Sequence, residues 1–418
     1  MQVPGLLDAT PLIDGHNDLP AALREKAGYS VARLDVERPE LHTDIVKLRQ
    51  GKVGGQFWSV WVPSDISEDA AVVATLEQVD AVHRIVAAYP DTFGLACTAD
   101  DVERVFGSGR IASLIGIEGG HSIAESLGAL RMFGRLGVRY MTLTHNDDTS
   151  WAASATGVRQ STGLNEAGRA IVTEMNRIGM IVDLSHTAES TQLDALATTS
   201  APVIFSHSSA RAVADHPRNV SDAVLAELAG NGGVVQITFV PGFISQPCVD
   251  WRREMLAKRV ELGLDPHTPQ GHPGSSALRS DFAVAPKPGE SLESVRRRND
   301  ELLAADEDEG KPAEARAALN SWIEENPRPE ADLSDVVSHL EHAREAAGID
   351  HIGIGGDYDG TSTLPIGLEN VSRYPALFSE LASRGWSGAD LQKLAGRNVL
   401  RVMRAVEHAA HEPLWPEC

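Results

Sequence analysis

The chain has 418 residues, of which 42% are hydrophobic and 23% are charged, so it can bury a large core. Its formal net charge is −22, from 59 acidic and 37 basic residues, which argues against nucleic acid or an anionic membrane as a partner because both require a basic face. The acidic excess predicts a solvated surface that favours solubility; the alternative is a field that attracts a positively charged substrate.

The cysteines and the N-terminal residues indicate the cellular compartment of the protein. Only Cys97, Cys248 and Cys418 occur, far apart and without a Cys-x-x-Cys pair, so neither a disulfide framework nor a thiolate zinc site is expected. The first twenty residues lack a basic segment followed by an apolar one, and no apolar run reaches membrane-spanning length. We therefore expect a cytoplasmic protein without a membrane partner.

Short apolar and β-branched runs alternate along the chain with longer amphipathic stretches. Eight of these runs are predicted to be strands, at residues 11–14, 55–62, 113–118, 139–145, 180–186, 202–207, 232–239 and 351–357. Their nearly continuous apolar character is typical of parallel strands that are covered on both faces. Eight such units in sequence favour an α/β fold of the closed (β/α)8 type, a TIM barrel, over an open doubly wound sheet.

Helices are predicted between the strands, among them 164–177, 221–229 and 333–347. The polar, proline-bearing segment 244–331 breaks the alternation after the seventh strand. We predict that it is a helical insertion on the catalytic face of a single barrel domain spanning residues 1–418, with helices at 291–304 and 312–325. A last amphipathic helix at 390–409 is expected to pack on the barrel wall; a contact in a homodimer is the alternative.

Residues that can bind a metal or move a proton stand at the ends of most of these strands. In chain order they are His16, Asp18, Glu118, His145, His186, His207, Asp357 and Asp359. The carboxyl ends of the strands in a parallel barrel share one rim, so we expect these side chains to converge there. An extended His-x-Asp places both side chains on one side of a strand, and imidazole with carboxylate suits zinc.

Taken singly, each of these residues has an ordinary structural explanation. A histidine after a strand is more often a surface or hydrogen-bonded core residue, Glu118 could cap a helix, and the glycines of GGDYDG could form a simple turn. The repeated occurrence of such groups at the same end of apolar strands has no shared packing explanation and favours a metal site. Histidines on other helix-like stretches, including His42 and His339, are expected to be solvated.

Several motifs resemble those of the membrane (renal) dipeptidase family, zinc peptidases of the amidohydrolase superfamily. They are DGHNDLP, GIEGG, YMTLTHNDDTSWA, GMIVDLSH, PVIFSHSSAR, RNVSDAVL and GIGGDYDG followed by GLENVSRYP. They lie in the family's order from residue 14 to 375. The resemblance implies the (β/α)8 barrel and, as cofactor, two zinc ions per subunit: one bound by His16 and Asp18, the other by His186 and His207, with Glu118 and a hydroxide bridging both.

The resemblance also implies roles for residues around the metals. His145 resembles the substrate-binding histidine that stabilises the oxyanion. Arg218 resembles the arginine that pairs with the C-terminal carboxylate of the peptide, with Arg211 as a rival of lower rank. Asp357 resembles the general acid/base, ahead of Asp359.

The function that we predict is hydrolysis of the peptide bond of dipeptides, with tolerance of a D-residue at the C-terminal position. Phe239 and Phe243 stand where members of the family may carry a tyrosine near the substrate carboxylate, so that contact is absent from the prediction. The alternatives are lactone or cyclic-amide hydrolysis on the same centre, or a non-catalytic peptide-binding or metal-storage protein. Cobalt and manganese also accept such ligands.

Overall fold

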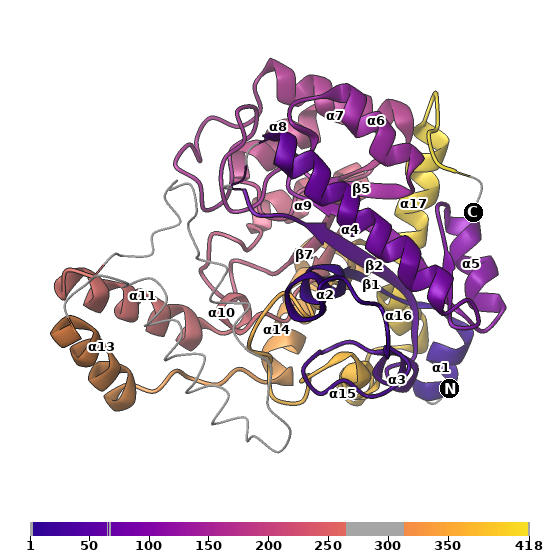
Figure 1. Cartoon of the computed structure of the whole chain (residues 1–418). Coiled ribbons are helices and arrows are strands. Elements are labelled where there is room, and N and C mark those ends of the chain that lie inside the picture. Colours follow the sequence, from indigo (N-terminus) through magenta and orange to yellow (C-terminus); the bar gives the residue numbers. More distant parts are fainter. Residues whose placement is uncertain (1–2, 65, 67, 265–312, 417–418) are drawn as a thin grey trace.

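A computed structural model describes residues 3–64, 66, 68–264 and 313–416. At its centre, eight parallel strands close into a barrel (Figure 1). They are β1 (Leu12–Asn17), β2 (Val53–Trp61), β4 (Ile111–Glu118), β5 (Val138–Thr142), β6 (Ile181–Asp183), β7 (Ile204–Ser208), β8 (Val234–Ile237) and β9 (Ile352–Ile354). β1 pairs with β2 and with β9, and the pairing of β2 with β4 completes the ring. The predicted (β/α)8 barrel is confirmed, and each of the eight predicted strands overlaps one of these.

One short strand lies outside the ring. β3 (Phe93–Leu95) pairs with the first residues of β4, whose later residues pair with β5 on the same edge. β3 was not predicted, because three residues are too few to give a periodic signal.

Helices surround the barrel (Figure 1). Before the seventh barrel strand they are α1 (Val3–Ala9), α2 (Leu19–Ala27), α3 (Ile45–Gln50), α4 (Glu68–Ala88), α5 (Ala99–Gly107), α6 (Leu127–Arg135), α7 (Glu166–Ile178), α8 (Glu189–Thr198) and α9 (Asp222–Asn231). Short 3-10 turns occupy Gly120–Ile123, Ile349–His351 and Val371–Arg373. Local capping sets several starts: the side chain of Asn165 accepts a hydrogen bond from Gly168 N at α7, and that of Ser221 accepts one from Val224 N at α9.

The helical insertion follows β8. It contains α10 (Pro241–Ile244), α11 (Gln246–Glu261) and α13 (Ala313–Glu325), and α14 (Leu333–Ala347) leads back to β9. α13 and α14 match the predictions at 312–325 and 333–347, whereas the predicted helix at 291–304 lies outside the described residues. α11 was not predicted. It lies beside α13 at one side of the barrel (Figure 1), and the rings of Trp251 and Trp322 stand 6.2 Å apart between them.

The C-terminal part consists of α15 (Tyr374–Ser383), α16 (Gly388–Gln392), a π-helical turn at Lys393–Arg397 and α17 (Asn398–Ala409). The predicted helix at 390–409 is therefore interrupted by the π-turn. Its second half packs on the barrel as predicted, because Val399, Val402 and Met403 share a buried cluster with strand residues such as Phe57 and Leu114.

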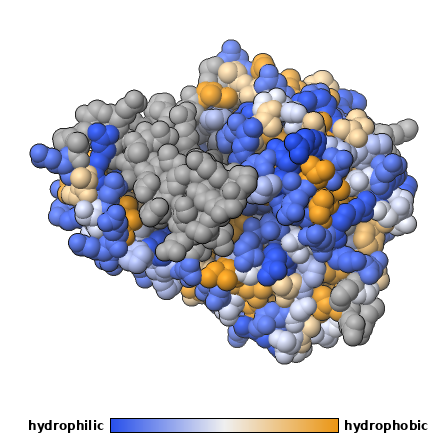
Figure 2. All heavy atoms as spheres, turned by 60° about the horizontal axis from the view of Figure 1, so that its bottom comes forward, coloured by the Kyte–Doolittle hydropathy of each residue, from blue (hydrophilic) through white to orange (hydrophobic). Residues whose placement is uncertain are grey.

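The face shown in Figure 2 is hydrophilic over most of its described surface, and its apolar residues form small separate groups. Most of this described surface is therefore suited to contact with water. Among the described residues, no helix combines the length and the apolar character that crossing a membrane requires. Cys248 is a buried thiol that donates a hydrogen bond to Pro329 O at 3.2 Å, whereas Cys97 is disulfide-bonded, which the spacing of the cysteines did not predict.

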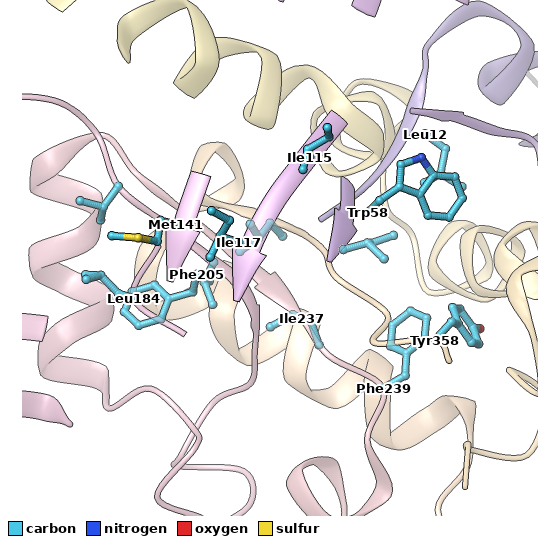
Figure 3. Packing of buried hydrophobic residues seen from close by; sticks show 14 of the residues in the cluster. Leu12, Trp58, Ile115, Ile117, Met141, Leu184, Phe205, Ile237, Phe239 and Tyr358 are labelled. Atoms are coloured by element: carbon cyan, nitrogen blue, oxygen red, sulfur yellow. The ribbon is translucent and has the colours of Figure 1, made fainter. Parts of the chain in front are cut away.

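The main hydrophobic core fills the space between the strands and the surrounding helices (Figure 3). Strand residues such as Trp58, Ile117 and Ile237 are completely buried there. Near the metal-binding rim, Phe239 packs edge-on against Tyr358, with ring centroids 5.7 Å apart (Figure 3). The core thus holds the strand ends in fixed positions, which is what a site built on those ends requires.

Candidate metal centre and substrate pocket

The carboxyl ends of the barrel strands bring the predicted ligands together around Glu118. This glutamate is the last residue of β4 and is 5% exposed. Its Oε1 atom lies 2.9 Å from His186 Nε2 and 3.3 Å from His207 Nε2, and its Oε2 atom lies 3.3 Å from His16 Nε2. Asp18 Oδ2 lies 3.3 Å from the same His16 nitrogen. All five residues predicted to bind metal therefore meet in one buried place.

The hydrogen bonds behind His186 and His207 direct the lone pair of each Nε2 into this space. Ser206 donates its hydroxyl proton to Asp183 Oδ2 at 2.6 Å, so the same hydroxyl accepts a bond from His207 Nδ1 at 2.8 Å. The Nδ1 atom of His186 donates to Asn146 Oδ1 at 3.0 Å. Both protons are thus on Nδ1. The two Nε2 atoms stand only 2.9 Å apart with lone pairs that repel each other unless a cation lies between them and Glu118.

His16 is oriented in the same way. The hydroxyl of Tyr140 donates to Gly15 O at 3.2 Å and therefore accepts from His16 Nδ1 at 3.0 Å. His16 Nε2 is buried without a hydrogen-bond partner, and so is Asp18 Oδ1. Unsatisfied buried acceptors of this kind are unfavourable unless a cation satisfies them. The residues present therefore fit a metal centre with nitrogen and oxygen ligands.

Among the described residues, three groups of side chains have possible ligand atoms that all lie within 4.8 Å of one another. They are His16, Glu118 and His207; Glu118, His145 and His186; and His16, Asp18 and Asp357. The groups share Glu118 and His16, so the possible metal positions adjoin. Borderline metals such as zinc accept these ligands.

His145 differs from the other three histidines in which ring nitrogen carries its proton. Trp61 Nε1, which can only donate, lies 3.3 Å from His145 Nδ1, so the proton of the neutral imidazole is on Nε2. That Nε2 faces Glu118 Oε1 at 3.6 Å. Burial lowers the pKa of His145 to about 3, which keeps the ring neutral at pH 7. His145 thus presents an N–H donor where the other three histidines present lone pairs.

The two aspartates after β9 have separate surroundings. Asp357 lines the pocket, and burial raises its pKa well above the usual range, aided by the negative charges of Asp18 and Glu118 and opposed by His16. Asp359 instead accepts a hydrogen bond from His42 N at 2.8 Å, while its own N–H donates to His42 Nδ1. The prediction that His42 lies on a solvated helix is wrong, because His42 anchors a loop to Asp359.

The backbone is strained at this rim. His186, Asp357 and Asp359 have φ angles of 65°, 62° and 65°, in the left-handed region that side chains disfavour. Gly360 permits Asp18 and Asp357 to approach each other, since a Cβ atom at residue 360 would stand 2.2 Å from Asp18 Oδ2 and 2.5 Å from Asp357 Oδ1. The conformation therefore turns Asp357 toward Asp18 and the pocket.

The two candidate arginines also differ. Arg218 is buried and lines the pocket, and its Nε and Nη1 atoms have no hydrogen-bond partner. Burial lowers its pKa to about 10, so it stays charged at pH 7. Arg211 forms an ion pair with Glu189 at 2.8 Å and donates to two backbone carbonyls of the loop. Of these two arginines, Arg218 is therefore the one whose guanidinium nitrogens are available to a ligand in the pocket.

The pocket has a volume of about 200 Å³. One part is formed by residues of the metal centre. Another is formed by Phe243, which the sequence placed near the substrate carboxylate, and by loop and insertion residues that the sequence did not indicate, namely His216, Val240, Val249, Arg252, Arg253 and Leu256. Sequence reasoning also missed Trp61, Tyr140, Asn146 and Ser206, which orient the histidines. Asn146 and Ser206 are chain neighbours of the histidines at strand ends, a position where such partners can be sought; for Trp61 the sequence holds no comparable signal.

The comparisons with known proteins agree with this geometry. The sequence matches the membrane dipeptidase family (peptidase family M19) over residues 1–417. It is 40% identical over 421 residues to an uncharacterized dipeptidase of Schizosaccharomyces pombe, covering 96% of this chain and 83% of the relative. It is 37% identical over 438 residues to dipeptidase verJ of Clonostachys rogersoniana, covering 99% and 92%.

Two crystal structures share the fold. The probable dipeptidase PvdM of Pseudomonas aeruginosa has a TM-score of 0.78 at 22% identity, over 98% of both chains. A Rhodobacter sphaeroides metallopeptidase, liganded with a phosphinate mimic of L-Ala-D-Ala, has a TM-score of 0.71 at 22% identity, over 95% of this chain and 99% of the other. Together with the family match, these findings show that the chain belongs to the membrane dipeptidase family, peptidase family M19, and is a metallopeptidase of the dipeptidase type.

Proposed function

We propose that this enzyme is a binuclear zinc dipeptidase that uses a metal-bridging hydroxide as nucleophile. The observation that carries the proposal is the position of Glu118, whose two carboxylate oxygens face different histidines. A carboxylate in this position can bridge two ions. His16 and Asp18 would hold one ion, and His186 and His207 the other. When bound, two zinc ions would lower the pKa of the shared water and polarise the scissile carbonyl.

The substrate is held by Arg218 and His145. The unpartnered Nε and Nη1 atoms of Arg218 suit the two oxygens of a C-terminal carboxylate, because the guanidinium fork matches that anion. The Nε2–H group of His145 is available to donate to the oxygen that becomes negative when the carbonyl is attacked. A donor that is already fixed before the reaction stabilises that charge without reorganisation.

Asp357 transfers a proton from the nucleophile to the leaving amine. Its buried position and raised pKa suit a carboxyl group that accepts a proton as the nucleophile attacks and then gives it to the leaving amine nitrogen. Asp359 is less suited, because its side chain already accepts the hydrogen bond of His42 N.

Tolerance of a D-residue at the C-terminal position is part of the proposal. A residue held chiefly through its carboxylate on Arg218 is selected weakly by the direction of its side chain. The L-Ala-D-Ala mimic bound by the Rhodobacter sphaeroides enzyme supports the same expectation.

The proposal is tested by metal reconstitution with dipeptides. The purified protein is stripped with a chelator and titrated with zinc, while hydrolysis of L,L- and L,D-dipeptides and bound metal are measured. We expect no turnover without metal and full turnover at two equivalents. Failure to hydrolyse any dipeptide with zinc supplied would overturn the dipeptidase assignment. Full activity at one equivalent would overturn the binuclear centre, and inactivity on every L,D-dipeptide would overturn the D-tolerance.

A further inference from the structure

The part of the pocket formed by the loop after β7 and by α11 is rich in positive charge and hydrogen-bond donors. We call it the arginine end; it is formed by His216, Arg218, Arg252 and Arg253. The acidic residues that line the pocket are Asp18, Glu118 and Asp357, all of which belong to the metal centre. In a chain with a net charge of −22, this separation of charge within one pocket is notable. A cleft lined by one sign of charge concentrates ligands of the other sign.

The two arginines of α11 are not equivalent. Arg253 is exposed, and its charge is balanced by Asp215 at 2.9 Å and Asp250 at 3.4 Å. Arg252 is half-buried and lines the pocket. Within residues 3–64, 66, 68–264 and 313–416, no carboxylate forms an ion pair with Arg252. Arg252 therefore presents to the pocket a positive charge that no carboxylate of the described residues balances.

His216 adds a neutral donor beside Arg252. Its Nδ1 accepts a hydrogen bond from Arg218 N at 3.2 Å, so the imidazole proton is on Nε2. Burial holds the pKa of His216 well below its ordinary value, and the positive charges of Arg252 and Arg218 lower it further. Its ring stacks on Phe243, with centroids 4.6 Å apart, which fixes its orientation.

Arg218 alone can satisfy the C-terminal carboxylate of a dipeptide, so Arg252 and His216 remain for another group. A second carboxylate is the group that matches a guanidinium together with an N–H donor. The scissile carbonyl must reach the metal ligands to be cleaved, so a C-terminal dicarboxylic residue whose main-chain carboxylate is held by Arg218 would place its second carboxylate at the arginine end.

We propose that Arg252 and His216 form a second carboxylate site, so that the preferred substrates are dipeptides with aspartate or glutamate at the C-terminal position. This inference rests on the proposed dipeptidase function and adds its substrate class. It also gives the insertion between β8 and β9 a role in selectivity, because α11 supplies Arg252.

The test compares a carboxylate with its neutral amide isostere. The zinc-reconstituted enzyme is assayed with Ala-Glu and Ala-Gln, each with an L- or a D-residue at the second position. We expect kcat/KM to be at least about tenfold higher for the Glu substrate of the better-used configuration, since a charged partner at a built site discriminates strongly against a neutral one. In Arg252→Met this ratio should fall to about threefold or less, through loss of activity on Ala-Glu while activity on Ala-Gln is kept.

Activity of Arg252→Met on Ala-Gln serves as the internal measure of folding. Lys258→Met is the matched control, because it removes a positive charge from the same helix at a residue that pairs with Glu261 and does not line the pocket. It should leave the ratio unchanged. The second carboxylate site would be overturned by equal kcat/KM values of the unmodified enzyme on Ala-Glu and Ala-Gln. It would also be overturned if Arg252→Met kept the full preference for Ala-Glu over Ala-Gln. Absence of hydrolysis of every dipeptide would instead refute the proposed function itself.

Discussion

The metal end and the arginine end of the pocket are built in different ways. The metal end consists of side chains at barrel strand ends, and the Nδ1 atom of each of its histidines has a defined partner. The arginine end comes from the loop after β7 and from α11, and the Nε and Nη1 atoms of Arg218 have no hydrogen-bond partner among the described residues. The strand-borne end thus presents acceptors that suit a cation, whereas the loop-borne end presents donors that suit an anion.

This difference places the residues that carry out the reaction on the barrel strands and the residues that select the substrate on the loops and the insertion. Side chains fixed by the barrel suit a reaction whose geometry must not vary, and loops on the same rim can change without disturbing it. We therefore expect changes at the metal end to lower turnover on every substrate, and changes at the arginine end to depend on the charge of the substrate.

The largest effect is expected at the metal end, for Asp357→Asn. Asparagine tolerates the positive φ at this position, so the backbone should be retained while the proton carrier is lost. We expect kcat to fall by about a hundred- to ten-thousand-fold on all dipeptides. Elemental analysis should still find two metal ions per chain; loss of metal in this variant would make Asp357 a ligand.

The corresponding change at the arginine end is Arg218→Met. Removing the guanidinium should lower kcat/KM for free dipeptides by about a hundredfold or more, because a buried charge pair is broken. Dipeptide amides, which lack the C-terminal carboxylate, should be hydrolysed as slowly by the variant as by the unmodified enzyme. An equal loss on both substrates would contradict carboxylate binding by Arg218.

A smaller effect concerns stability of the arginine end. His339 is completely buried on α14; its Nδ1 accepts from Ala210 N at 3.0 Å and its Nε2 donates to Ile244 O at 3.0 Å. These bonds tie the loop that carries Arg218 to the start of the insertion. The prediction that His339 is solvated is therefore wrong.

Burial lowers the pKa of His339 to about 4 from an ordinary value of 6.5. The unfolded chain therefore binds the proton more readily, and stability that is present above pH 6.5 is lost as pH falls toward 4. Between pH 7 and pH 5 we expect this histidine to account for a loss of about 2 kcal/mol in the free energy of unfolding. Denaturant unfolding of His339→Gln should show a correspondingly weaker pH dependence; an unchanged pH dependence would contradict the assignment.

The smallest effect returns to the metal end. Trp61→Phe removes the N–H group that fixes the proton of His145 on Nε2. We expect kcat to fall by about tenfold with KM and metal content unchanged, since one preorganised donor is weakened rather than deleted. Trp58→Phe is the control, because the Trp58 indole nitrogen is buried without a partner. Equal effects of the two changes would point to packing instead of to the tautomer.

The sequence predicts the metal end far better than the arginine end. Buried parallel strands give continuous apolar runs, so a His or Glu at the end of each run is visible, and the ring of strands implies that these ends converge. α11 gave no such signal, because its buried residues Cys248, Val249, Trp251 and Arg259 do not form an apolar stripe of helical period.

His339 could have been placed from the sequence. It stands on α14 among Val336, Leu340, Ala343 and Ala347, whose spacing marks the buried face. What the pattern could not supply is its partners, since Ala210 and Ile244 belong to other elements. The same applies to Trp61 and Tyr140, whose contacts with histidines depend on the closed ring.

The pairing of β1 with β9 also bears on how the enzyme is made. Asp14 pairs with Ile354 in the ring and accepts hydrogen bonds from Gly356 N and from the Tyr374 hydroxyl. His16 and Asp18 are thus synthesised long before β9, the strand that pairs with β1 in the closed ring. A growing chain cannot close the ring around the metal centre before β9 is made, so metal loading must follow the slow closure of contacts between distant parts of the chain.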